Sequence, residues 1–154
     1  MYWYVCMTKK NILIVEDDDT YLKLFKKVIK ELGTNNIFAA SNAEEAFKII
    51  ESEPIDLLVS DILLQKMNGY KLAQLVRAHH PHAEILLTTG YQTDLDRFDF
   101  RGVRCHLLHK PYHKMTDVST LIERLLNKKN VFEGMDEDSF GENEICPEIT
   151  EWTL

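Results

Sequence analysis

Acidic residues follow apolar runs at two places in this 154-residue chain. Glu16 and Asp17 come directly after the run at 12–15, and Asp61 ends the segment at 56–61. Carboxylates that lie close together repel one another, so a cluster of them is costly unless a cation neutralises it. Compact oxygen ligands favour Mg²⁺, which usually keeps waters and a phosphate in its shell. The pattern predicts a metal site that handles phosphate.

A hydroxyl and an ammonium group occupy similar positions further along the chain. Thr89 ends the apolar run at 84–90, and Lys110 ends the run at 105–110. A carboxylate can attack a phosphoryl group, while a lysine and a threonine contact the phosphoryl oxygens. We expect Asp61 to be the nucleophile, because it ends a buried apolar strand and has the most fixed surroundings.

These residues need a scaffold that brings strand ends together. Short apolar runs predict five strands, at 11–15, 36–40, 56–61, 84–90 and 105–110. Helical spacing predicts helices between and after them, at 19–33, 41–50, 69–80, 93–100 and 117–127. Strands that alternate with helices form a doubly wound parallel sheet in the α/β class, and ligands bind at its carboxyl edge.

Three local signals refine this scheme. Ser41 and Glu44 have the spacing of a capping box at a helix start. Asp18 and Asp19 suit the N-cap and first turn of the first helix, where negative charge is favoured. Gly69 is expected to permit a left-handed turn after the third strand.

Four segments in order carry a family resemblance. "ILIVEDD", "DLLVSDILLQKMNGY", "ILLTTGY" and "HKPY" resemble the receiver domain of two-component response regulators, and the match spans 10–127. The resemblance implies a flavodoxin-like (βα)5 fold with strand order 2-1-3-4-5. It also implies a phosphoprotein that accepts a phosphoryl group from a histidine kinase or a His-phosphotransfer protein, and that catalyses only its own phosphorylation and dephosphorylation.

The resemblance also assigns roles to single residues. The phosphoacceptor would be Asp61, the Mg²⁺ ligands would be Glu16, Asp17, Asp61 and the main-chain carbonyl of Leu63, and the phosphate-contacting residues would be Thr89 and Lys110. Gln65 departs from the family pattern at a position where many receivers have Pro, and so does Leu107, which stands where many receivers have a switch aromatic. The departure at Leu107 questions the usual coupled switch and leaves the phosphorylation chemistry intact.

The ends of the chain differ from its centre. We expect 1–9 to be an N-terminal extension and 128–154 to be a disordered acidic tail. Residues 131–154 hold eight of the 25 acids and no Lys or Arg, so the remainder nearly balances its 18 basic residues. Neither part shows the basic stripe of a nucleic-acid binder or a run that could insert into a membrane. Three widely spaced cysteines suit a reducing cytoplasm.

Several alternatives stay open. A pseudo-receiver could bind a partner without phosphate. A small Asp-dependent phosphatase usually has a second Asp two residues after the nucleophile, where this chain has Leu63. A flavin-binding relative would need a phosphate-cradling loop in place of the acids after the first strand. The histidines at 79–82 are expected to cap a helix and not to bind metal. Our main expectation is a stand-alone receiver that signals to an unknown output protein through protein contacts or passes its phosphate on.

Overall fold

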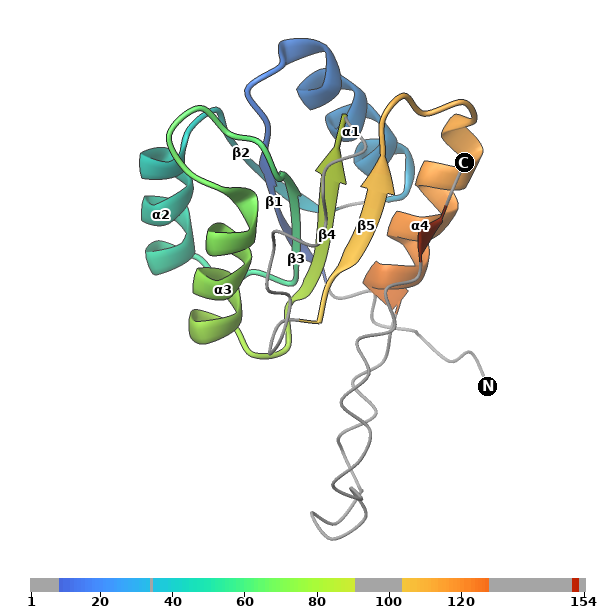
Figure 1. The fold of residues 1–154 in the computed structure, drawn as a ribbon. Coiled ribbons are helices and arrows are strands. Elements are labelled where there is room, and N and C mark those ends of the chain that lie inside the picture. Colours follow the sequence, from blue (N-terminus) through green and yellow to red (C-terminus); the bar gives the residue numbers. More distant parts are fainter. Residues whose placement is uncertain (1–8, 34, 91–103, 128–150, 153–154) are drawn as a thin grey trace, which may run out of the picture.

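The computed structural model describes residues 9–33, 35–90, 104–127 and 151–152 (Figure 1). Its elements in chain order are β1 Asn11–Val15, α1 Asp19–Glu31, β2 Asn36–Ala40, α2 Ala43–Ser52, β3 Leu57–Asp61, α3 Gly69–His79, β4 Glu84–Thr89, β5 His106–His109, α4 Met115–Asn127 and β6 Glu151–Trp152. The predicted helix at 93–100 and residues 1–8 of the predicted extension at 1–9 lie outside the described residues.

One parallel sheet organises the molecule. Its strand order is β2-β1-β3-β4-β5-β6, which confirms the predicted order of the first five strands. The two-residue β6 adds a strand that the sequence did not predict, beside β5 and within the segment expected to be disordered. Disorder in the rest of that tail stays a prediction, because 128–150 and 153–154 lie outside the described residues.

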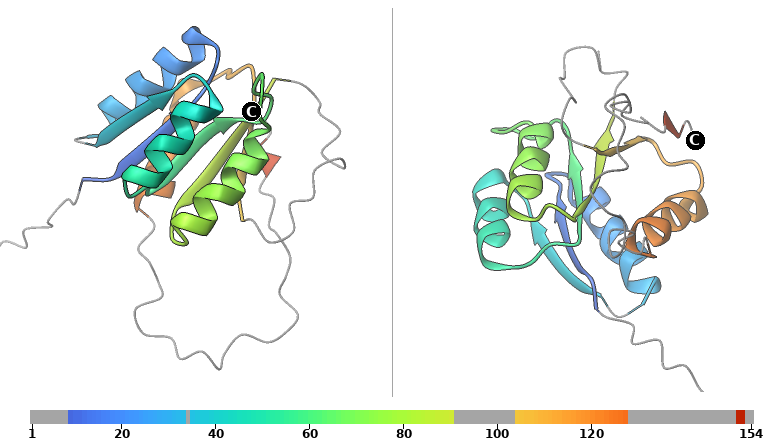
Figure 2. Two further views of the ribbon diagram at one scale, coloured as in Figure 1. Left: turned by 90° about the vertical axis from the view of Figure 1, so that its left-hand side faces the viewer. Right: turned by 90° about the horizontal axis from the view of Figure 1, so that it is seen from below.

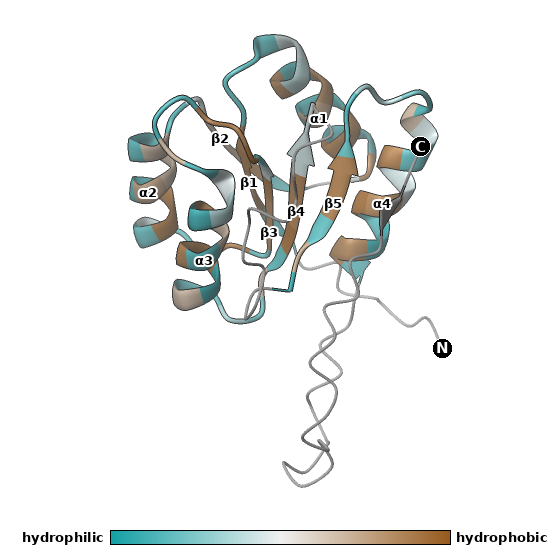
Figure 3. Cartoon of the chain, in the orientation of Figure 1, coloured by the Kyte–Doolittle hydropathy of each residue, from teal (hydrophilic) through white to brown (hydrophobic). Residues whose placement is uncertain are grey.

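Two helical layers cover the sheet, as the views in Figure 2 show. Helices α2 and α3 pack on one face, against a cluster that includes Leu13, Leu58 and Leu87. Helices α1 and α4 pack on the other face, against a second cluster that includes Ile14 and Val59. Because β1, β3 and β4 are buried on both faces, they are apolar along most of their length (Figure 3). The core therefore fixes the strand ends from both sides.

Two of the predicted local signals are wrong in detail. Asn42, and not Ser41, is the N-cap of α2, and its side chain accepts a hydrogen bond from the Glu45 amide at 3.0 Å. Glu45, and not Glu44, reaches back, and its carboxylate accepts from the Ser41 amide at 3.0 Å. The predicted pair lies one residue too early, because Ser41 and Glu44 have the same capping chemistry as Asn42 and Glu45.

Gly69 serves close approach and not a left-handed turn. Among the described residues only Gly33 has a positive φ, of 133°, where α1 ends. A Cβ on Gly69 would collide with the main-chain carbonyl of Asp61. The first residue of α3 is therefore a glycine because it packs directly on the last residue of β3.

Polar side chains at the amino ends of the strands tie connections together. The Asn11 amide donates to the Asp56 carboxylate at 2.8 Å, and its side chain donates to the Pro54 carbonyl at 2.7 Å. At the end of α3, Nδ1 of His79 lies 2.9 Å from the Leu75 carbonyl oxygen, and Nε2 of His80 lies 2.9 Å from that of Ile50. These histidines belong to a helix end, as predicted.

Candidate functional site

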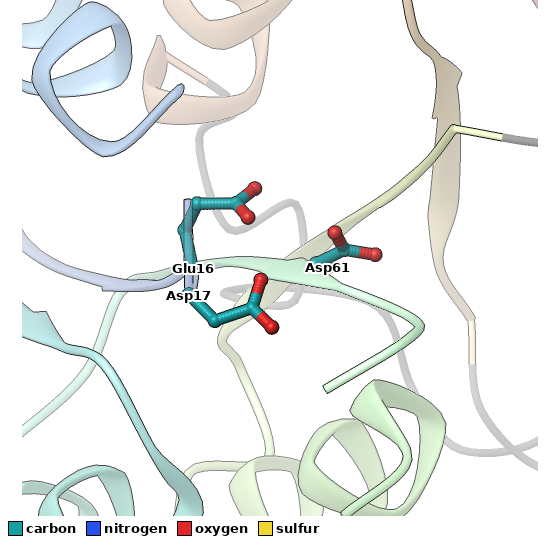
Figure 4. A group of neighbouring side chains, drawn as sticks. All are labelled: Glu16, Asp17 and Asp61. Carbon is teal, nitrogen blue, oxygen red and sulfur yellow. The ribbon is translucent and has the colours of Figure 1, made fainter. Parts of the chain in front are cut away.

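Three carboxylates meet at the carboxyl edge of the sheet. Glu16 follows β1 and is 2% exposed, Asp61 ends β3 and is 9% exposed, and Asp17 is exposed. The strands are neighbours, with Val15 paired to Ser60, so their ends bring the acids together. One oxygen from each carboxylate lies within 4.8 Å of the others, and Figure 4 shows the side chains converging. Within the described part of the chain, this is the one acidic, cysteine or histidine cluster with metal-binding geometry.

Lys110 supplies the positive charge that balances two of these acids. Its ammonium lies 2.7 Å from a Glu16 carboxylate oxygen and 3.0 Å from Oδ2 of Asp61. The side chain is only 8% exposed, so this ion pair is largely shielded from water. The Lys110 amide donates to the Thr89 carbonyl at 2.7 Å, which fixes the residue just beyond β5 against the end of β4.

Burial and charge oppose each other at this cluster. Burial raises the pKa of Glu16, and the hydrogen bond from Lys110 offsets that effect only in part. Burial also acts to lower the pKa of Lys110, but its bonds to Glu16 and Asp61 outweigh burial and leave this pKa raised. Lys110 therefore stays protonated, and an additional cation would further stabilise the charged form of the carboxylates.

The loops after β1 and β3 point their amides at the same carboxylates. Asp18 is the N-cap of α1, as predicted, and its amide donates to Glu16 at 3.1 Å. The Leu63 amide donates to Oδ1 of Asp61 at 2.9 Å, while the Leu63 side chain is 48% exposed. Both oxygens of Asp61 are therefore oriented, one by a main-chain amide and the other by Lys110.

Thr89 lies where the sequence places it, at the last position of β4. It is completely buried and pairs in register with His109 of β5. Its neighbour Thr88 pairs with Asp61 in the ladder and is 1% exposed. The sheet thus brings the ends of β1, β3, β4 and β5 to a single edge, as the motif order required.

The architecture and this acidic edge agree with the comparison to known protein families. The model of the response regulator receiver domain matches residues 12–125. The chain belongs to the response regulator receiver family. Receivers are in general signalling modules without a catalytic turnover of their own, and the acidic triad is typical of the family's Mg²⁺ site.

Two curated relatives show how much of the chain is shared. The receiver is 29% identical over 118 residues to the response regulator receiver protein CpdR of Brucella abortus (strain 2308), covering 76% of this chain and 97% of CpdR. It is 32% identical over 91 residues to the transcriptional regulatory protein YvrH of Bacillus subtilis (strain 168), covering 59% of this chain and 38% of YvrH. The chain therefore spans well under half of YvrH.

Solved receiver structures agree with the fold. A CheY-like receiver domain protein from Methanospirillum hungatei JF-1 superposes with a TM-score of 0.68 at 28% identity, covering 77% of this chain and 94% of that one. The chemotaxis response regulator CheY4 of Vibrio cholerae superposes with a TM-score of 0.65 at 19% identity, covering 77% and 99%. No helix in the described segments of this receiver has the length and apolar character needed to cross a membrane.

The departure at Leu107 has a clear structural setting. Leu107 is 3% exposed and pairs with Leu87, within the core cluster under α2 and α3. The position that carries an aromatic in many receivers is therefore a packed core residue here. Lys110, three residues later, still reaches both acids, so the pattern around the site is preserved.

Two tyrosines next to the site were missed as functional candidates. The ammonium of Lys110 lies 4.0 Å from the centroid of the Tyr21 ring, which in turn packs edge-on against Tyr112. The sequence pattern assigned Tyr21 to the apolar face of α1. Only its position four residues after Asp17 could have indicated that it lies near the site. Tyr112 lies two residues after Lys110, and burial raises the pKa of its hydroxyl far above the usual range.

Proposed function

We propose that this receiver accepts a phosphoryl group on Asp61 from a phosphohistidine donor in a Mg²⁺-dependent reaction. The observation that carries the proposal is the grouping of the Asp61 carboxylate with Glu16, Asp17 and Lys110 at one sheet edge. A plain strand-end cap would need neither two further acids nor a buried lysine. The donor would be a histidine kinase or a His-phosphotransfer protein.

The residues divide the work of phosphoryl transfer among them. A carboxylate oxygen of Asp61 forms the new P–O bond while the P–N bond of the donor breaks, and the released imidazole nitrogen takes a proton from solvent. Lys110 exchanges a carboxylate contact for a phosphoryl oxygen, where its compact charge offsets the added negative charge. The Thr89 hydroxyl binds a second phosphoryl oxygen.

The acidic cluster fits the metal that this role requires. Glu16, Asp17 and Asp61 offer oxygens within reach of one ion, and the main-chain carbonyl of Leu63 would complete the protein ligands. Mg²⁺, when bound, supplies positive charge shared between the carboxylates and the phosphoryl oxygens. Burial raises the pKa of Glu16 and Lys110 offsets this only in part, so a cation beside this carboxylate would be favourable.

The phosphorylated receiver would act through protein contacts or pass its phosphate on. Its binding partners would be the phosphate donor and an output protein. Neither nucleic-acid binding nor membrane insertion has a role in the proposal. CpdR, of which the chain covers 97%, is itself named a response regulator receiver protein. Action in the cytoplasm and without an attached output domain stays a prediction.

The mass of the intact protein tests this function. We expect one added phosphate after incubation with acetyl phosphate and Mg²⁺, and none after chelation or in Asp61→Asn. A mass gain that persists in Asp61→Asn would contradict the assignment of the nucleophile.

A phosphate-independent binding module is the second candidate. Its support is Leu107, which is buried in the core where many receivers have a switch aromatic. Absence of a mass gain, together with no change in thermal midpoint on adding Mg²⁺, would favour this module over the phosphoacceptor.

A further inference from the structure

The outer edge of β5 carries a partner strand. Glu151 and Trp152 form β6, which runs parallel to β5 with Leu107 opposite Glu151 and Leu108 opposite Trp152. In Figure 1 this short segment is drawn in dark red. An uncovered edge would expose a row of main-chain donors and acceptors to other chains.

The hydrogen-bonding directions along β5 follow from one contact. The Lys110 amide donates to Thr89 on β4. Because successive amides in a strand point to opposite sides, the Leu108 amide also faces β4, whereas the amides of Leu107 and His109 face the outer edge. Those two amides are therefore the donors that β6 can satisfy.

Charge complementarity favours the acidic tail as the occupant of this edge. Residues 104–114, which contain β5 and the loop after it, hold no acid, and beside the site residue Lys110 they carry the cations Arg104 and Lys114. Residues 131–154 hold eight acids and no lysine or arginine. The tail is thus attracted to β5 by charge before any hydrogen bond forms.

The distance along the chain allows the occupant to come from the same molecule. The 13 residues of α4 lead away from β5, and 23 residues join the end of α4 to β6. An α-helix of that length spans roughly 20 Å, whereas the connecting segment can reach roughly 75 Å when extended. The tail can therefore return to β5 without strain.

We propose that the outer edge of β5 is a strand-docking site that the acidic C-terminal segment of the same chain occupies. A ladder of two residues is weak by itself, but the tether holds the segment at a high local concentration. The tail then competes with any partner that adds a strand to β5, and such a partner must displace it. This inference rests on the sheet and on charge, and it holds whether or not Asp61 accepts phosphate.

Amide hydrogen exchange of the full chain, measured by NMR, tests the proposal. In the double variant Glu151→Pro/Trp152→Pro, the amides of β6 that donate to β5 carbonyls are lost and the proline rings disfavour the ladder, so β6 should undock and its carbonyls should no longer accept from Leu107 and His109. We expect Leu107 and His109 to exchange roughly tenfold faster than in the wild type, while Leu108 is unchanged. The matched control is Glu144→Pro/Ile145→Pro, which also replaces one acid and one apolar residue of the tail, and it should exchange like the wild type.

A synthetic peptide of residues 145–154 provides the second arm. Added to the Glu151→Pro/Trp152→Pro variant, it should slow exchange at Leu107 and His109 in a dose-dependent way, and a scrambled peptide should not. Protection in the wild type should be independent of protein concentration. Protection that disappears on dilution together with a dimer would assign the occupant to a second copy and overturn docking within one chain.

The wild type alone decides the matter if the proline variant does not fold. An occupied edge slows exchange at Leu107 and His109 roughly tenfold below the rate of an unstructured amide. Fast exchange at both outer-edge amides beside a protected Leu108 would show an open edge and overturn the proposal.

Discussion

The two ends of the sheet use polar residues in opposite ways. At the amino end, Asn11 and Asp56 satisfy each other and nearby main-chain groups through single hydrogen bonds. At the carboxyl end, Glu16, Asp61 and Lys110 form a shielded cluster with fewer positive than negative charges. In the first arrangement the polar groups are paired with one another, whereas in the second the excess negative charge can be neutralised by a bound cation. Residues at the amino ends of these strands thus stabilise the fold, whereas residues at the carboxyl ends form the candidate site.

The sharpest test of this division exchanges one acid at each end. Asp61→Asn should abolish the phosphate-dependent mass gain, because the amide is a poor nucleophile. Asp56→Asn, five residues earlier on the same segment, should keep the mass gain, because that side chain only accepts a main-chain hydrogen bond. Intact-protein mass after acetyl phosphate treatment measures both. Equal loss in the two variants would show that the ends are not separate.

Removing the lysine tests whether the charge cluster is balanced internally. Lys110→Met leaves Glu16 and Asp61 close together without their cation, and we expect a loss of about 2–4 kcal/mol in the free energy of unfolding in metal-free buffer. Mg²⁺ should restore more stability to this variant than it adds to the wild type.

Urea denaturation with and without Mg²⁺ measures the Lys110→Met effect. Lower pH should also reduce the difference in free energy of unfolding between Lys110→Met and the wild type. Burial already raises the pKa of Glu16 in the folded state, and loss of Lys110 would raise it further, so protonation of Glu16 stabilises the variant more than the wild type. A variant as stable as the wild type in metal-free buffer at neutral pH would argue against the buried ion pair.

At the amino end a substitution should affect stability without chemistry. Asn11→Ala removes the side-chain bonds to the Pro54 carbonyl and from Asn36, each near 2.7–2.8 Å. We expect a loss of about 1 kcal/mol in the free energy of unfolding and an unchanged rate of phosphorylation. Thermal unfolding and the time course of the mass gain check the two halves, and a slower time course would link the two ends.

The smallest expected effect concerns the ring beside Lys110. Tyr21→Leu removes a cation–π contact of about 0.5–1 kcal/mol, which corresponds to roughly a two- to fivefold slower phosphorylation. Tyr21→Phe retains the ring face and should behave like the wild type. The initial rate with acetyl phosphate at fixed Mg²⁺ distinguishes them, and equal rates in all three proteins would remove Tyr21 from the site.

The sequence was informative where a single rule determined the outcome. Uninterrupted apolar runs predicted the five strands, because strands buried on both faces are apolar along most of their length, and the family resemblance supplied their order. Polar residues at the ends of those runs predicted which acids meet Lys110. The capping residue Asn42 was missed because Ser41 satisfies the same rule.

Other features depended on distances that no local pattern contains. Gly69 is required by the Asp61 carbonyl, which packs against it across a loop. Tyr21 faces Lys110 from α1, which is nearly 90 residues away in sequence. The β6 strand forms only because β5 offers an edge, and two residues carry too short a pattern to predict it.

The contact between Gly69 and the Asp61 carbonyl has a mechanical consequence. The Asp61 carbonyl contacts the first turn of α3, so rotation of this peptide unit would push the helix. The end of β3 and the start of α3 should therefore move together. The Gly69 amide also donates to the carbonyl of Ile62, the residue after β3, at 2.9 Å, which adds a second contact between α3 and the end of this strand. A displacement of the Asp61 main chain should therefore be passed directly to the first turn of α3.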